Sequence, residues 1–195
     1  MKKKLYIILT MLLIAMLTTT PVFARGAIKL SKISFELGSL ISTGFAGGLG
    51  NTDWVLVLDG TGHAGVICTN NGENDVPGQS SPHVEGRGVD IVNGNDPLKK
   101  NGKSPYEVIA KSGYEESQFI SWEDGGCPNS NWTAKIDFVY WDTATINAYD
   151  PTDTDFLNPV ATYEFECVTT RTGPNGTDST FDDGTVSCVQ TYPVK

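Results

Sequence analysis

The two histidines of the chain, His63 and His83, are the side chains best suited to acid–base chemistry. A serine hydrolase needs a nucleophile, a histidine and an orienting acid in contact. His63 lies in a glycine-rich stretch that predicts a hairpin turn, and His83 follows Ser80-Ser81-Pro82. The chain has no Gly-x-Ser-x-Gly nucleophile motif. We therefore interpret both histidines as surface residues and place a secreted hydrolase behind the other hypotheses.

Carboxylates are the second group that could do chemistry. A glycosidase uses two of them, one as acid and one as base or nucleophile. Candidate pairs are Glu123 with Asp124 and Asp59 with Asp90, but neither has an identifying spacing. With 23 acidic residues in the chain, pairs of this kind are expected by chance. The sequence therefore favours a non-enzymatic role and indicates no catalytic residue.

Clustered aspartates could instead coordinate calcium, which prefers several hard oxygen ligands. One cluster comprises Asp150, Asp153 and Asp155, and a second comprises Asp178, Asp182 and Asp183. Neither matches the twelve-residue calcium loop, and aspartate is also common in turns for conformational reasons. Calcium is thus the one cofactor that the sequence leaves open.

Aromatic rings exposed on a sheet or loop mark binding surfaces. The candidates for a sugar-stacking surface are Trp122, Trp141 and Tyr149, whereas Trp132 alternates with core residues. By strict alternation, Trp141 points away from the face of Ile136. It is then either exposed for binding or, as we prefer, buried under residues 156–165.

The N-terminus predicts export. Three lysines precede an apolar run that ends at a threonine cluster and a proline, so residues 1–24 are expected to be a cleaved signal peptide, with Arg25 at the new N-terminus. The net charge of −9 becomes more negative on cleavage, because the leader carries lysines and no acids. Such acidity argues against nucleic acid or anionic lipid as a partner. We expect a secreted or cell-surface protein with no membrane contact after cleavage.

The chain contains four cysteines, and an even number in an exported protein indicates disulfides. None lies in a Cys-x-x-Cys or Cys/His cluster, so a zinc site is not expected. Residue types alone leave three pairings open. Of these we prefer Cys68–Cys127 and Cys167–Cys188, because the second pair ends two runs of core-facing residues on either side of a polar loop.

Short runs of alternating or continuous apolar residues, separated by turn residues, predict strands along the whole mature chain. The clearest are 28–37, 54–58, 64–69, 131–141, 143–149, 163–167 and 186–192, with a hairpin turn at 59–62 and weaker candidates at 84–92 and 106–110. No stretch after the leader has helical periodicity. The predicted fold class is all-β, an antiparallel two-sheet sandwich that is immunoglobulin-like in the broad sense. We expect a single domain over 25–195, in which residues 150–195 could form an appended disulfide-linked hairpin.

Three segments occur in an order that resembles a known group. They are GLGNTD at 48–53, CTN at 68–70 followed by PGQ at 77–79, and CPNSNWTA at 127–134. In this order the chain resembles a group of small exported bacterial β-sandwich proteins of unknown function, over about residues 33 to 149. The resemblance implies a sandwich and pairing of Cys68 with Cys127, but no activity. Residues 84–120 and the tail after Tyr149 depart from the pattern, and a specific function could reside there.

Together these patterns predict an exported, non-enzymatic β-sandwich with a structural or adhesive role at or outside the cell surface. Its partner would be a polysaccharide or another surface protein. The alternatives are a carbohydrate-binding module that uses exposed aromatics and, less well supported, a secreted hydrolase.

Overall fold

The structure is a computed structural model, and it describes residues 28–37, 39–48, 50–98, 102–173 and 184–191. These residues form ten strands and no helix. The predicted signal peptide and new N-terminus lie outside the described residues. The strands are β1 (Lys29–Glu36), β2 (Leu40–Gly47), β3 (Trp54–Asn70), β4 (Asp75–Pro77), β5 (His83–Val92), β6 (Lys103–Ala110), β7 (Phe119–Ile120), β8 (Trp132–Tyr149), β9 (Ala161–Arg171) and β10 (Gly184–Gln190).

The strands form two antiparallel sheets, which confirms the predicted all-β sandwich. The smaller sheet has the order β1-β2-β6. The larger has the order β10-β9-β8-β3-β4, with β5 also paired to β3 and β7 to β8. The sheets meet at both sides, because β1 lies against β10 and β5 lies against β6, with a bridge from Arg87 of β5 to Lys111 just after β6.

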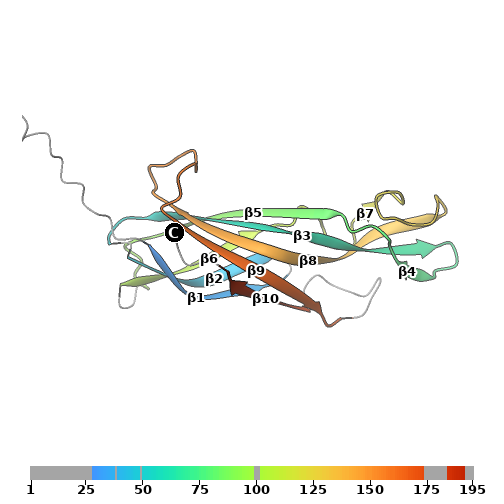
Figure 1. The fold of residues 1–195 in the computed structure, drawn as a ribbon, viewed down its shortest axis with the longest axis horizontal. Helices are drawn as coiled ribbons and strands as arrows, with labels where there is room; N and C mark the ends of the chain where they lie inside the picture. The colour runs from blue at the N-terminus through green and yellow to red at the C-terminus, as the bar shows by residue number, and fades with distance from the viewer. Residues whose placement is uncertain (1–27, 38, 49, 99–101, 174–183, 192–195) are drawn as a thin grey trace, which may run out of the picture.

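Two long strands, β3 with 17 residues and β8 with 18, run along the length of the molecule (Figure 1). Their apolar side chains alternate into the space between the sheets, where Leu56, Leu58 and Ile146 are fully buried. A tyrosine links the beginning of β1 to this core. The Tyr163 hydroxyl donates to Ile28 O at 3.1 Å and accepts from Leu30 N at 2.9 Å. These contacts position the sheets against each other.

The predicted hairpin at residues 59–62 is wrong, because these residues lie inside β3. Gly60 and Gly62 are needed for close packing rather than for a turn. A Cβ at Gly60 would lie 2.9 Å from Trp141 Cζ3, and a Cβ at Gly62 would lie 2.0 Å from the backbone oxygen of Tyr140. Glycine in a strand interior often marks such a close approach.

The predicted break between 131–141 and 143–149 is also wrong, since β8 is continuous. It contains two register shifts against β3, which leave Asp137 and Asp142 as extra residues. Each bulge changes which side of the strand faces the core. Val139 and Trp141 consequently join Ile136 in the core, while Phe138 and Tyr140 lie on the opposite face.

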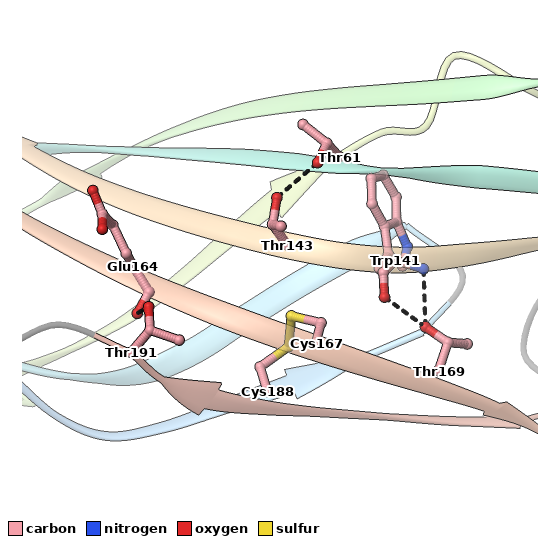
Figure 2. Close-up of a disulfide and its surroundings, with 8 residues drawn as sticks. All are labelled: Thr61, Trp141, Thr143, Glu164, Cys167, Thr169, Cys188 and Thr191. Carbon is pink, nitrogen blue, oxygen red and sulfur yellow. Dashed lines mark hydrogen bonds between the residues drawn. A yellow bond between two sulfur atoms is a disulfide. The ribbon is translucent and has the colours of Figure 1, made fainter.

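Both predicted disulfides are confirmed. Cys68 pairs with Cys127 at a Cα–Cα distance of 5.7 Å, and Cys167 pairs with Cys188 at 4.0 Å (Figure 2). The second distance is below the range of 4.4 to 6.8 Å expected of a disulfide. Cys167 and Cys188 are directly opposite in the β9–β10 ladder. The hydrogen bond from Thr191 N to Glu164 O makes this a non-hydrogen-bonded pair, in which strands approach most closely.

The distal halves of β3 and β8 extend beyond the smaller sheet, with β4 and β7 beside them at one end of the molecule (Figure 1). We call this part the arm: residues 66–77 and 118–136. Cys127, Trp122 and Trp132 pack on its inner side and give it an extension of the main core. The Cys68–Cys127 disulfide joins the loop before β8 to β3 within the arm.

Candidate functional site

The outer face of the larger sheet carries three consecutive cross-strand rows of polar side chains, which we call the polar strip. From β5 through β3 to β8 the rows are Arg87–Asp59–Thr145, Glu85–Thr61–Thr143 and His83–His63–Tyr140. The strand alternation that buries Leu58 and Ala64 turns these side chains outward. The strip thus follows the middle of β3, on the side away from the core.

Cross-strand contacts hold the strip side chains in place. The Thr61 and Thr143 hydroxyls are 2.7 Å apart (Figure 2), Arg87 Nη1 is 3.5 Å from Asp59 Oδ1, and His63 Nδ1 is 3.0 Å from Asp142 Oδ2. The His63 ring also stacks on Tyr140 at a centroid distance of 5.1 Å. The pairs are solvent-exposed, so each adds little stability. Their effect is to orient hydrogen-bonding groups before any ligand arrives.

The fold brings the two histidines opposite each other, which the sequence analysis did not predict. His63 and His83 are register partners on β3 and β5. The hydrogen bond from Ala64 N to Pro82 O identifies a non-hydrogen-bonded pair, whose Cβ atoms are about 5 Å apart. The sequence feature that we missed is the continuity of β3. If residues 59–62 are taken as part of the strand, His63 faces outward beside β5.

The histidines do not form a nucleophilic site. His63 contacts Asp142 and Tyr140, and His83 contacts Glu85 at 3.3 Å. Within the described ranges, no serine or threonine hydroxyl hydrogen-bonds to either ring. A general base must lie within hydrogen-bond reach of the group that it activates. The contacts that the two rings make are with carboxylates and with the Tyr140 ring.

The surface is hollowed over two rows of the strip and again beyond its third row. A hollow of about 490 Å³ between β3 and β5 is lined by Asp59, Thr61, Glu85 and Arg87. A second hollow, of about 200 Å³, lies where the arm begins and is lined by residues that include Ser80, Ser81 and Tyr140. The two hollows extend the polar surface from Asp59 to Ile67 along β3.

A buried ion pair supports the second hollow. The two terminal nitrogens of the Arg171 guanidinium, Nη1 and Nη2, donate to the Asp137 carboxylate, and the side chains of the pair are 9% and 6% exposed. The guanidinium also lies 5.3 Å from the centre of the Phe138 ring. Burial lowers the pKa of Arg171, but the contacts with Asp137 outweigh it and the net pKa is raised. The ion pair holds the bulged part of β8 against β9.

The candidate aromatic surface is not formed by Trp141 or Tyr149. The preferred burial of Trp141 is confirmed, since the side chain is fully buried, although on the core face that it shares with Ile136. Tyr149 is 5% exposed. Tyr149 and Phe156 pack edge to face at 5.3 Å and cover Val55 and Val57 on the outer side of the sheet. Trp122 is half-buried and packs against the core of the arm. Alternation failed for Trp141 because the bulge at Asp137 reverses the faces of β8.

The first aspartate cluster is used to form turns. Asp150 accepts hydrogen bonds from the backbone and hydroxyl of Thr152, and Asp153 accepts one from Asn158 N. Asp155 is exposed. Among the residues that the structure describes, no group of three or more histidine, cysteine, aspartate or glutamate side chains is arranged to hold a metal ion. The second cluster, Asp178, Asp182 and Asp183, lies outside the described residues.

Neither proposed carboxylate pair forms a catalytic arrangement. Asp59 points outward with Thr61, whereas Asp90 is two residues from each of the inward-facing Gly88 and Val92 and shares their face. The two aspartates therefore lie on opposite faces of the sheet. Asp124 accepts a hydrogen bond from the Ser121 hydroxyl at 2.6 Å, and the backbone oxygen of Glu123 accepts one from Gly126 N. Both thus belong to an exposed turn.

Comparisons with known proteins identified no related protein. No protein-family model matches the chain, and a search of curated proteins finds no match. The resemblance to small exported β-sandwich proteins therefore stays a prediction. None of the described residues belongs to a helix long and apolar enough to cross a membrane.

Proposed function

We propose that the protein is an exported, non-enzymatic binding domain with an adhesive role at or outside the cell surface, and that the polar strip is its contact surface. The observation that supports this most is the strip itself: ordered hydrogen-bonding groups along β3, with one hollow over two of the rows and a second beside Tyr140. Ligand sites are commonly concave, with a small number of well-placed polar groups.

The covalent structure fits an extracellular setting. Disulfides persist in oxidising compartments and are rare in the cytosol. Both disulfides are formed, and no cysteine is free. Together with the predicted leader, they support export.

The shape of the strip favours an extended polar ligand, and we propose a polysaccharide. From Asp59 to Ile67 the surface spans about 26 Å, at roughly 3.3 Å per residue of strand. Its hydroxyl, carboxylate, guanidinium and imidazole groups can donate to and accept from sugar hydroxyls. Recognition would rest on these hydrogen bonds, because Trp141 and Tyr149 are buried.

The test is binding of the mature protein to insoluble and arrayed polysaccharides. The double substitution Thr61→Val with Arg87→Gln removes a hydroxyl and a charge from the strip and leaves the core unchanged. We expect it to weaken binding about tenfold or more, since each hydrogen bond to a charged or hydroxyl group is worth about 1 to 3 kcal/mol. Thr43→Val on the smaller sheet, whose side chain faces outward there, is the matched control. Equal binding by both variants would contradict the proposed surface.

A further inference from the structure

The outer face of the smaller sheet carries a row of two lysines separated by a glycine. Lys29 of β1 and Lys103 of β6 both lie opposite Gly47 of β2 in the register of the sheet. Neighbouring strands are about 4.8 Å apart, so the two lysine backbones are separated by roughly 10 Å. Their side chains project from the same face, with no side chain between them.

A hollow of about 340 Å³ occupies this position. Its lining comprises Lys29, Leu30, Ser31, Gly47, Gly48, Gly102 and Lys103. None of these described lining residues carries a carboxylate. The Lys103 ammonium donates to the Ser31 hydroxyl at 3.2 Å, which brings both groups to the same side of the hollow.

The charge of the hollow is opposite to that of the chain. The protein has a net charge of −9, with 23 acidic residues. Lysines in such a protein are expected to pair with acids, yet within the described part of the chain neither Lys29 nor Lys103 forms a salt bridge. A third lysine, Lys32, lies with its Nζ 5.9 Å from the centre of the half-exposed Phe45 ring in the next row.

Packing does not require the glycine between the lysines. A Cβ at Gly47 would have its nearest contact at 3.4 Å, with Lys103 Cγ, which is an ordinary van der Waals distance. Gly48 and Gly102, by contrast, have φ values of +81° and +73° and serve the adjoining turns. A larger side chain at position 47 would stand between the lysines and fill the hollow. A glycine at position 47 therefore keeps the space between the two lysines open.

We propose that this hollow binds a tetrahedral oxyanion, sulfate or phosphate, between the ammonium groups of Lys29 and Lys103, with the Ser31 hydroxyl as a further donor. Ammonium–oxyanion hydrogen bonds are among the stronger ones in proteins. The anion is either a free ion or an ester group on a polymer. This site is on the other sheet from the polar strip and does not depend on the proposed polysaccharide binding.

The direct test is an NMR titration of the untagged mature protein with sodium sulfate and with sodium phosphate, at constant ionic strength set by sodium chloride. We expect saturable shifts at Ser31, Gly47 and Lys103. Lys29→Gln and Lys103→Gln should each weaken binding about tenfold, as expected for the loss of one charge-assisted hydrogen bond. Gly47→Thr should abolish saturation while keeping both lysines.

The matched control is Lys135→Gln on β8, whose ammonium lies 5.8 Å from the Phe119 ring in the arm. It removes the same charge and should leave the titration unchanged. Linear shifts in all variants, or equal weakening by Lys135→Gln, would show only general ion screening and overturn the site.

A second experiment identifies the source of the anion. Binding of dextran sulfate is compared with that of uncharged dextran and of free sulfate, on the wild type and on Gly47→Thr. Tighter binding of dextran sulfate that Gly47→Thr abolishes would assign the site to a sulfated polymer. Equal affinity for free sulfate would assign it to the ion. If neither probe distinguishes wild type from Gly47→Thr, the proposal is wrong.

Discussion

Trp141 is the residue on which the packing of the two long strands depends most. Its indole fills the space left by Gly60 of β3 and Gly86 of β5, whose added Cβ atoms would lie 2.9 Å and 2.7 Å from the ring. We expect Trp141→Ala to lower the free energy of unfolding by about 3 to 5 kcal/mol, because the cavity cannot collapse onto two glycines. Thermal or urea unfolding measures the loss.

Trp141→Phe is a second variant that separates the loss of side-chain volume from the loss of a hydrogen bond. The Trp141 indole nitrogen has no hydrogen-bond partner among the described residues. Phenylalanine therefore removes volume and no hydrogen bond, and its stability should lie between those of wild type and Trp141→Ala. An alanine variant with an unchanged unfolding midpoint would mean that Trp141 is exposed after all.

Tyr106 should make stability depend on pH in the alkaline range. Burial raises its pKa from 10.0 to about 12, although the nearby Ser42 side chain acts to lower it. The native state keeps the phenol proton that the unfolded chain loses above its ordinary pKa. Stability is therefore full below pH 10 and falls as the pH rises toward 12, by roughly 2 to 3 kcal/mol.

Urea unfolding at pH 9, 10 and 11 tests this, with Tyr106→Phe beside the wild type. The variant should lose less stability over this interval. Tyr163 also has a raised pKa because of burial and contributes in the same direction, so a residual slope is expected. Parallel slopes for the two proteins would exclude Tyr106 as the group responsible.

At the scale of the elements, β3 depends on glycine where β8 comes closest. A Cβ at Gly62 would overlap the Tyr140 backbone oxygen at 2.0 Å, so Gly62→Ala must push the strands apart at the bulge. We expect a loss of about 1 to 3 kcal/mol, as for other overpacked sites. Gly47→Ala, whose added methyl has ordinary contacts, should change stability by less than about 0.5 kcal/mol. Similar losses in both variants would show that strand propensity, and not the close approach, sets the effect.

The sequence predicted most strands but misjudged how β3 and β8 continue. Apolar alternation located parts of both correctly. Glycines at 60 and 62 resemble a turn when considered locally, because their packing partner, Trp141, lies about 80 residues away on another strand. Likewise, the bulges at Asp137 and Asp142 arise from pairing with β3 and leave no mark in a one-strand pattern. Long-range contacts therefore decided the faces of β8.

At the scale of the molecule, the dependence on long-range contacts also explains why the sequence did not predict the candidate sites. The fold class follows from short strand patterns, and the Cys167–Cys188 pair follows from two runs of core-facing residues. The pairing of Cys68 with Cys127 was preferred among three and implied by the resemblance, and it too is present. The polar strip combines residues 59–63, 83–87 and 140–145, and the lysine hollow combines residues 29, 47 and 103. Only the sheet order brings these together, and separate lysines or threonines in a sequence carry no sign of it.

The elongated shape suggests that the arm and the sandwich differ in what stabilises them. In the arm, the loop before β8 is attached through the two-residue strand β7 and the Cys68–Cys127 disulfide, which spans a separation of 59 residues. On the chain-entropy account, closing such a loop contributes roughly 4 kcal/mol. We expect that replacing both cysteines by alanine opens the arm while the sandwich stays folded.

Hydrogen exchange resolves the two parts. Amides of β3 and β8 within the arm, such as Ile67 and Ile136, should exchange much faster in Cys68→Ala with Cys127→Ala, whereas those of Leu56 and Ile146 should be little changed. Replacing Cys167 and Cys188 by alanine is the matched control, because that disulfide joins neighbouring strands with a separation of 21 residues. It should affect β9 and β10 instead. Uniformly faster exchange in the arm variant would mean that arm and sandwich unfold as one unit, since a local opening leaves protection elsewhere intact.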